Sequence, residues 1–250
     1  MSALLNIQDL AIGYKKHDLK YALIKGFATS VFPGERIAIM GLNGCGKSTL
    51  LRSITGILPL LNGSIQINNK EIGQLTGRGK SQMMATVFTS YNDPGQLTVN
   101  EMVTFGRYPY TNRFNTLSKK DLSLIENTLE VAKIRHLKNR IVGELSDGER
   151  QKVMMAVAIA QDTPLLILDE PASHLDIRNK ALMMNLIKRL GEEQQKTILF
   201  STHDVGLTLK IATRVWLFHN KRITNYNIDE FKQGEHWKLM LEGLDEDLIG

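Results

Sequence analysis

The sequence predicts an α/β fold, a mostly parallel sheet with helices on both sides. An apolar segment, residues 36–40, runs straight into a glycine-rich loop that a helix-forming segment follows. A continuous apolar run, residues 165–168, is typical of a strand buried on both faces. Elsewhere strand-like and helix-like segments alternate, which is the pattern of an α/β protein.

The individual elements follow from apolar periodicity and from start and stop signals. Strands are expected over residues 4–10, 36–40, 65–67, 86–88, 165–168, 197–201 and 215–218. Helices are expected over residues 47–55, 118–132, 146–159 and 181–190. Residues 90–109 are predicted to be loop-rich, because Asp93-Pro94-Gly95 is a turn signal. Residues 234–250 are predicted to form a short amphipathic helix followed by an acidic tail.

The composition is that of a globular protein. Of the 250 residues, 42% are hydrophobic and 23% are charged, and the net charge is +5. The cations are scattered, so a nucleic-acid partner is not expected. Cys45 is the only cysteine, which excludes an intrachain disulfide. No apolar run approaches the ~20 residues of a membrane span, and no signal-peptide pattern is present. We therefore expect a cytosolic chain that could bind a membrane protein from that side.

A phosphate-binding loop is the strongest motif in the chain. It has a glycine, four residues and then Gly-Lys-Ser, and its members are Gly41, Leu42, Asn43, Gly44, Cys45, Gly46, Lys47 and Ser48. Its glycines let backbone N–H groups converge on an anion, and the following helix directs its positive end there. Lys47 would contact the β- and γ-phosphates of ATP, and the Ser48 hydroxyl would bind Mg²⁺. A functionless glycine turn is the alternative, which the strand before and the helix after disfavour.

Cys45 lies inside this loop. It is either a small filler residue or a reactive thiol, because a helix N-terminus and Lys47 are expected to favour the thiolate. We expect a thiol reagent to inactivate the protein and ATP to protect it.

Two carboxylates follow the buried strand at residues 165–168. Asp169 would hold Mg²⁺ through water, and Glu170 would polarise the attacking water as a general base. His203, just after the strand at residues 197–201, could contact the γ-phosphate and the same water. The alternatives are a surface turn before Pro171 and a structural histidine.

Residues 145–151, Leu-Ser-Asp-Gly-Glu-Arg-Gln, resemble the signature motif of ABC ATPases. The order of phosphate loop, signature, Asp-Glu pair, Ser173-His174-Leu175-Asp176 and His203 is also the order of that family. The resemblance covers essentially the whole chain. It implies a RecA-like P-loop NTPase core with an N-terminal antiparallel β portion and an inserted α-helical subdomain. The implied divisions are a catalytic core at 1–88 and 162–225, a helical subdomain at 89–161 and a C-terminal extension at 226–250.

The resemblance also implies a head-to-tail homodimer. Each ATP would lie between the phosphate loop of one copy and the signature of the other, which is Ser146, Asp147, Gly148, Glu149 and Gln151. Tyr14 would stack on adenine, and Thr49 would extend the ATP site. Ser146 and Glu149 have the spacing of a capping box, so Ser146 marks a helix N-terminus that can face a phosphate.

This sequence departs from the family pattern at two places. Asp147 and Glu149 add negative charge near an anion, unless Arg150 or Lys152 offsets it. Thr89 stands where the family usually has a glutamine that touches Mg²⁺ and senses the transporter. A threonine hydroxyl is shorter and would reach the metal through water.

Three short segments, residues 97–101, 106–110 and 174–176, look like ATPases that serve importers of ferric siderophores, haem and vitamin B12. The resemblance implies two copies bound to a permease at the cytoplasmic face of the inner (cell) membrane, contacting it through residues 89–110. A substrate-binding protein would take part indirectly. The alternatives are a soluble ABC ATPase of DNA repair, translation or cluster assembly, and a regulatory nucleotide-binding module with little turnover.

Overall fold

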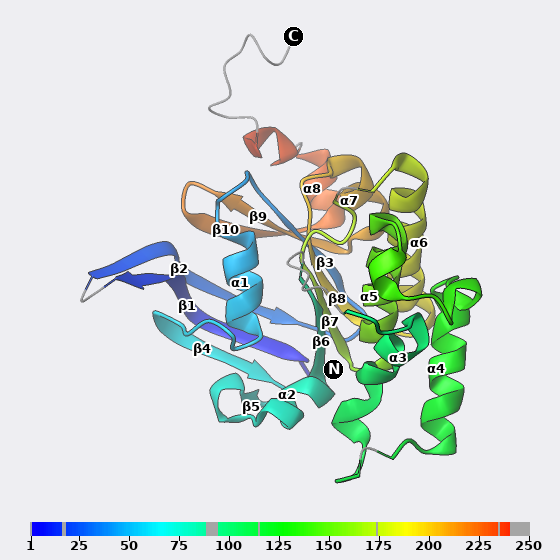
Figure 1. Cartoon of the computed structure of the whole chain (residues 1–250). Helices are drawn as coiled ribbons and strands as arrows, with labels where there is room; N and C mark the ends of the chain where they lie inside the picture. Colours follow the sequence, from blue (N-terminus) through cyan, green and yellow to red (C-terminus); the bar gives the residue numbers. More distant parts are fainter. Residues whose placement is uncertain are drawn as a thin grey trace. The chain divides into compact units, whose positions relative to one another are not determined.

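The computed structural model describes residues 2–16, 19–88, 95–114, 116–173, 175–234 and 236–240 (Figure 1). The chain divides into two compact units. The first comprises residues 1–72 and 200–250, and the second comprises residues 73–199. Within the described residues, no helix combines the length and apolarity needed to cross a bilayer.

The first unit contains an antiparallel sheet in the order β2-β1-β4-β5. Its strands are β1 (Leu5–Lys16), β2 (Leu19–Val31), β4 (Asn62–Ile67) and β5 (Lys70–Glu71). The alternating residues Leu5, Ile7, Ile65 and Ile67 are fully buried, as a sheet with one covered face requires. The expected N-terminal antiparallel portion is therefore present, and β1 extends well beyond the predicted residues 4–10.

The same unit contains three strands in the order β10-β9-β3. They are β3 (Arg36–Met40), β9 (Arg214–His219) and β10 (Arg222–Asn227), with β3 parallel to β9 and β9 antiparallel to β10. The helical elements are α1 (Lys47–Ile54), α7 (Val205–Ile211), α8 (Ile228–Gln233) and η5 (His236–Met240). All four apolar residues of β3 are buried, and the strand leads directly into the loop before α1.

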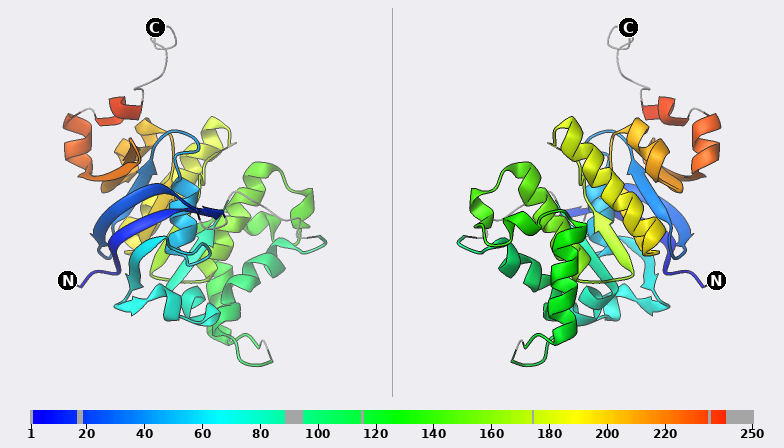
Figure 2. Two further views of the ribbon diagram at one scale, coloured as in Figure 1. Left: turned by 90° about the vertical axis from the view of Figure 1, so that its left-hand side faces the viewer. Right: turned by 90° about the vertical axis from the view of Figure 1, so that its right-hand side faces the viewer.

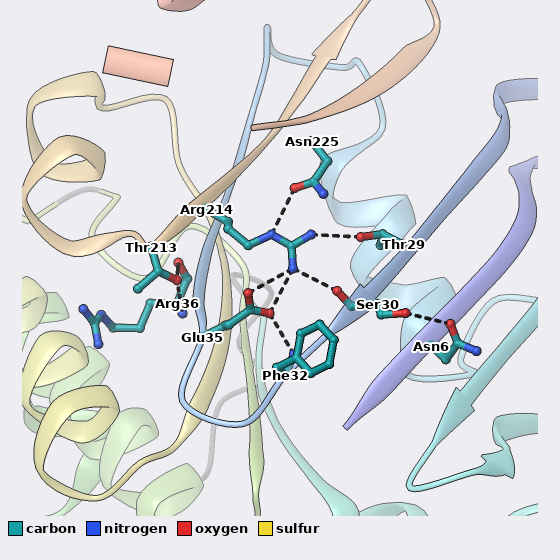
Figure 3. Close-up of polar contacts among 9 residues, drawn as sticks. All are labelled: Asn6, Thr29, Ser30, Phe32, Glu35, Arg36, Thr213, Arg214 and Asn225. Carbon is teal, nitrogen blue, oxygen red and sulfur yellow. Dashed lines mark hydrogen bonds and ion pairs between the residues drawn. The ribbon is translucent and has the colours of Figure 1, made fainter. Parts of the chain in front are cut away.

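An ionic cluster around Arg214 fixes the start of β9 (Figure 3). Its guanidinium donates to both oxygens of Glu35 at 3.0 and 2.9 Å, and also to the Ser30 carbonyl at 2.8 Å and the Thr29 hydroxyl at 3.0 Å. The Asn225 side chain on β10 accepts a further hydrogen bond at 3.2 Å. Arg214 thus joins β9 and β10 to β2 and to the turn that precedes β3.

The second unit combines parallel strands with helices (Figure 2). Its strands are β6 (Met84–Val87) and β7 (Leu165–Leu168), followed in the sheet order by β8 (Thr197–Ser201), which crosses the boundary between the units. Its helices are α2 (Gly77–Met83), α3 (Val99–Thr104), α4 (Lys119–Val131), α5 (Asp147–Ala160) and α6 (Ile177–Glu193). Short 3-10 helices are η1 (Ile72–Gln74) at the boundary, η2 (Phe105–Tyr110), η3 (Arg135–Leu137) and η4 (Val142–Glu144). β6 and β7 pair in parallel, and every residue of β7 is buried, as its continuous apolar sequence predicts.

Helices α3, α4 and α5 share one apolar core and form the green helical group of Figure 2. The core comprises Val99, Val103, Ile125, Leu129, Ala132, Ile134, Leu137, Val142, Leu145, Val153, Ala156 and Ala160. Gly106 is required beside it, because a Cβ atom there would lie 2.5 Å from the Val157 carbonyl oxygen. Arg107 is buried and donates to Asp121 at 2.8 Å and to the Ala160 carbonyl at 2.8 Å.

The structure corrects two predicted segments. Residues 90–109 are not loop-rich throughout: α3 begins at Val99 behind a complete capping box of Thr98 and Glu101, and η2 continues the helical backbone. At the C-terminal end, α8 already begins at Ile228, and Asn227 caps it. The helix predicted after residue 234 is instead the 3-10 helix η5, and residues 241–250 lie outside the described residues.

Candidate nucleotide-binding site

The phosphate loop of the first unit is built around close backbone approaches. A Cβ atom on Gly41 would lie 2.7 Å from the Phe218 Cβ and 2.8 Å from the Cys45 Sγ. Gly44 and Gly46 also have positive φ angles, of 78° and 113°, which favour glycine. Gly46 is the N-cap of α1, and no side chain caps the helix. The first backbone N–H groups of α1 therefore face the loop, as an anion site requires.

The Lys47 side chain is held in place by backbone carbonyl groups of the phosphate loop. Its ammonium donates to the Gly41 carbonyl at 2.8 Å and to the Leu42 carbonyl at 3.1 Å, and only 5% of the residue is exposed. Leu42, Asn43, Gly44 and Ser48 are exposed around it. The buried Lys47 ammonium and the exposed residue Ser48 thus both lie at the start of α1.

The expectation that the loop favours a Cys45 thiolate is wrong. Burial raises the pKa of the Cys45 thiol, and the opposing attraction of the Lys47 charge is the smaller effect. The Cys45 Sγ and the Phe218 Cβ both lie close to Gly41. The thiol is therefore less ionised than an ordinary cysteine at neutral pH.

Tyr14 lies beside the phosphate loop, at the first turn of α1. Its hydroxyl and the Thr49 hydroxyl share a hydrogen bond of 3.0 Å, and 55% of the residue is exposed. The structure therefore brings Tyr14 and Thr49 together next to Ser48. More than half of the residue is exposed, as stacking of its ring on a base would require.

His203 is exposed on the segment that follows β8. The Thr202 backbone N–H donates to the Ile39 carbonyl at 3.1 Å, so this segment lies beside the end of β3, just before Gly41. The next residue, Asp204, caps α7 by accepting a hydrogen bond from the Leu207 backbone N–H at 2.9 Å. The first unit thus brings the His203 backbone next to the strand that carries the phosphate loop.

Asp169 and Glu170 directly follow β7 in the second unit. Asp169 is only 2% exposed, and its backbone N–H donates to the Val87 carbonyl at 2.8 Å. Glu170 has a φ of 47°, a left-handed conformation that is uncommon for a residue other than glycine. The predicted acid pair is thus at the carboxyl end of a buried parallel strand.

Ser146 caps α5 as the sequence predicts. Its hydroxyl accepts from the Glu149 backbone N–H at 3.4 Å, while the Glu149 carboxylate accepts from the Ser146 backbone N–H at 3.0 Å. Ser146 and Asp147 are exposed at the N-terminus of this fourteen-residue helix. Thr89 and His174 lie outside the described residues, so the proposed role of Thr89 stays a prediction.

Comparisons with known proteins decide the family. The sequence profile described as ABC transporter matches residues 24–173, more than half of the chain. The chain belongs to the ABC transporter family. This confirms the resemblance, the predicted fold and the assignment as an ATP-hydrolysing subunit.

Named relatives of this ABC ATPase include two proteins of Bacillus subtilis. A probable siderophore transport system ATP-binding protein is 32% identical over 223 residues, which cover 89% of this chain and 79% of the relative. An iron(3+)-hydroxamate import ATP-binding protein is 34% identical over 202 residues, or 81% of this chain and 74% of the relative. A solved structure from Clostridium perfringens, cbiO1, part of an ABC transporter complex, is 27% identical with a TM-score of 0.80 and covers 100% of this chain and 98% of its own.

The unusual charges in the signature of this ABC ATPase have partners on its own helix. The Arg150 guanidinium donates to the Asp147 carboxylate at 3.2 Å. Hydrogen bonds from the Ser146 hydroxyl and backbone N–H lower the pKa of the Glu149 carboxyl, so it is ionised and held by the cap. Arg150 therefore offsets the added charge at Asp147, as one of the two sequence-based hypotheses expects.

Sequence reasoning missed several contacts of the ABC signature helix. The Gln151 side chain donates to the Pro171 carbonyl at 3.1 Å and is tied to its own chain. Asn179 on α6 lies against Gly148, and Asp176 holds it through its Nδ2 at 2.6 Å and its backbone N–H at 2.8 Å. The capping spacing of Asp176 and Asn179 is the one signal in the sequence that could have indicated this contact.

Proposed function

We propose that this chain is the ATP-hydrolysing subunit of an importer for a ferric siderophore, haem or cobalamin, working as a homodimer bound to a membrane permease. The observation that carries the ATPase function is the phosphate loop before α1. There the Lys47 charge, the open helix N-terminus and the exposed Ser48 hydroxyl meet. Together they form an anion site for the phosphates of ATP.

The ATP contacts are proposed residue by residue. Gly41 to Ser48 supply backbone donors to the phosphates, Lys47 supplies a positive charge, and Thr49 supports the first turn of α1. The exposed ring of Tyr14, fixed by its bond to Thr49, stacks on adenine.

Ser48 and Asp169 are proposed as the residues that would hold Mg²⁺. Ser48 has an exposed hydroxyl at the first turn of α1, and Asp169 has a buried carboxylate at the end of β7. Hydroxyl and carboxylate oxygens are ligands that Mg²⁺ prefers, with waters and phosphate oxygens completing the site. When bound, Mg²⁺ would neutralise charge on the phosphates, and Thr89 is proposed to contact it through water.

Glu170 is proposed as the general base and His203 as a contact of the γ-phosphate. Glu170 accepts the proton of the attacking water, and His203 orients that water from the segment beside β3. Lys47 stabilises the charge that develops on the transferred phosphoryl group.

The signature is proposed to act on the partner subunit's ATP in a head-to-tail dimer. Ser146 and Gly148 lie at the N-terminus of α5, where the helix dipole and backbone N–H groups favour a phosphate. Asp147 is paired with Arg150 and Glu149 is hydrogen-bonded to the N-cap Ser146, so these two residues do not argue for a regulatory module with little turnover. Relatives of similar fold include a dimeric ATP-binding cassette bound to ADP and Pi, which supports the proposed dimer.

The transported compound is proposed from the names of the relatives, which include siderophore transport and iron(3+)-hydroxamate import proteins. Permease contact is proposed for residues 89–110, at the cytoplasmic face of the cell membrane. Tyr108 and Tyr110 are 44% and 37% exposed there, and Arg107 lies over the Tyr110 ring at 4.2 Å. Exposed aromatic residues of this kind are enriched in protein interfaces.

Copurification and uptake test this proposal together. The tagged chain should copurify with a membrane permease, and cells lacking the chain should lose uptake of one iron–siderophore, haem or cobalamin substrate. Tyr108→Ala should weaken copurification, whereas Tyr226→Ala on β10 should not. A chain that copurifies with no membrane protein and whose loss leaves uptake of all three classes intact would contradict the importer function.

A further inference from the structure

The backbone at Glu170 is held in an unusual conformation. Its φ of 47° is left-handed, and the next residue, Pro171, restricts the preceding backbone further. Conformations of this kind persist only when surrounding contacts fix them. The position of the Glu170 carboxylate therefore depends on the groups that hold residues 170 and 171.

Ser173 is the first of these groups. Its backbone N–H donates to the Glu170 carbonyl at 3.0 Å, and its hydroxyl donates to the same oxygen at 2.9 Å. A single carbonyl oxygen thus accepts two hydrogen bonds from one residue. This closes the turn after Glu170.

Gln151 is the second group, and it lies on another element of the second unit, twenty residues earlier in the sequence than Pro171. It lies in the second turn of α5, and its Nε2 donates to the Pro171 carbonyl at 3.1 Å. Pro171 is buried, and Gln151 is half-buried. The helix that begins at the signature is therefore hydrogen-bonded to the residue directly after the proposed general base.

We infer that Ser173 and Gln151 are positioning residues for Glu170, and that Gln151 couples the two ATP sites of the dimer. This inference rests on the proposed function. The signature at the start of α5 would contact the partner's ATP, while Glu170 acts on the ATP of its own subunit. When the signature binds the partner's ATP, a small shift of α5 would pull on the Pro171 carbonyl through its hydrogen bond with Gln151. The neighbouring residue Glu170 would move with it.

Matched glutamine variants provide the test. Gln151→Met keeps the length of the side chain and removes the donor. Gln161→Met does the same at the C-cap of α5, where Gln161 Nε2 donates to the Met84 carbonyl at 2.9 Å. Ser173→Ala removes the hydroxyl that donates to the Glu170 carbonyl, and Ser173→Thr restores a hydroxyl at this position. ATP hydrolysis by the full-length chain with its permease is measured against ATP concentration, together with thermal unfolding.

For Gln151→Met we expect kcat to fall about threefold to tenfold, the loss of roughly one hydrogen bond, with KM for ATP within about twofold of wild type. The Hill coefficient for ATP should fall from about 2 toward 1, because two coupled sites become independent. Ser173→Ala should lower kcat similarly and Ser173→Thr should recover it. Gln161→Met should leave kcat and the Hill coefficient unchanged, even if it lowers the unfolding temperature.

The inference is overturned if Gln151→Met retains wild-type kcat and cooperativity, or if Gln161→Met loses as much of both. If Gln151→Met does not fold, Ser173→Ala and Ser173→Thr decide the positioning role by the same measurements. An inactive wild-type chain would instead refute the proposed function, so the two failures are distinguishable.

Discussion

The side-chain amide nitrogen of Asn179 lies 3.2 Å from the position that a Cβ atom on Gly148 would occupy. Asn179 cannot swing away freely, because Asp176 accepts hydrogen bonds from both its side chain and its backbone. The start of the signature helix α5 is therefore packed tightly on the start of α6. A methyl group at residue 148 must displace one of them by a few tenths of an ångström.

Gly148→Ala should therefore reduce ATP hydrolysis while changing stability little. The close contact opposes folding, but alanine gains about 1 kcal/mol of helix propensity over glycine. In an Asn179→Ala background the same substitution should have a smaller effect on turnover, since the crowding atom is absent. A double-mutant cycle on kcat measures this coupling. If the effects of the two substitutions on kcat are strictly additive, the contact between Gly148 and Asn179 does not influence turnover.

The Tyr14 ring, more than its hydroxyl, should determine ATP affinity. Tyr14→Phe removes the hydrogen bond to Thr49 and keeps the ring, so affinity should stay within about threefold. Tyr14→Ala should weaken ATP binding about fivefold to 150-fold, because a base stacked on an aromatic ring is worth about 1–3 kcal/mol. Calorimetric titration measures both. Tripolyphosphate, which has no base, should bind all three proteins equally, and a loss there would contradict the stacking role.

Cys45 should react more slowly with alkylating reagents than an ordinary thiol at neutral pH. Burial raises the pKa of the Cys45 thiol, so the reactive thiolate forms only at higher pH than usual. The pH profile of the alkylation rate measures this shift, with a free cysteine peptide as the control. Saturating ATP should slow the reaction further and protect activity. Equal rates with and without ATP would show that the thiol is remote from the nucleotide.

The buried pair of Arg107 and Asp121 should stabilise the helical group of the second unit. Their side chains are 8% and 11% exposed and lie 2.8 Å apart, so Arg107→Ala leaves a buried carboxylate without its cation. The expected loss is about 3 kcal/mol of unfolding free energy. The control is Arg135→Ala, which removes the exposed ion pair with Glu130 and should cost less than about 1 kcal/mol. Denaturant unfolding measures both, and equal losses would contradict this account.

The pair of Arg107 and Asp121 also predicts how the stability of the fold changes with pH. Hydrogen bonds from Ser118 first, and then from Arg107, lower the pKa of the Asp121 carboxyl below its usual value. A group with a lowered folded-state pKa stabilises the fold above its unfolded pKa and loses that contribution as pH falls through the folded pKa. Acidification below the ordinary aspartate range should therefore destabilise wild type more than Asp121→Asn.

Local patterns predicted the phosphate loop, the α5 cap and the buried strand β7, because neighbouring residues contain all the determinants. The helix α3 was missed, since the turn signal at Asp93-Pro94-Gly95 was extended over the capping box at Thr98 and Glu101. The raised pKa of the Cys45 thiol comes first from burial, which the local sequence does not reveal. The bond between Gln151 and Pro171 likewise joins residues twenty positions apart, and no local pattern indicates it.

The most direct test of the central claim compares wild type with Glu170→Gln in the presence of ATP and Mg²⁺. Wild type should hydrolyse ATP. The variant should lose turnover by about a hundredfold or more yet keep ATP bound in a stable dimer, measured by light scattering and by retained nucleotide. A Glu170→Gln protein that still hydrolyses ATP at the wild-type rate, or that stays monomeric with ATP bound, would contradict the account of Glu170 as general base in a head-to-tail dimer.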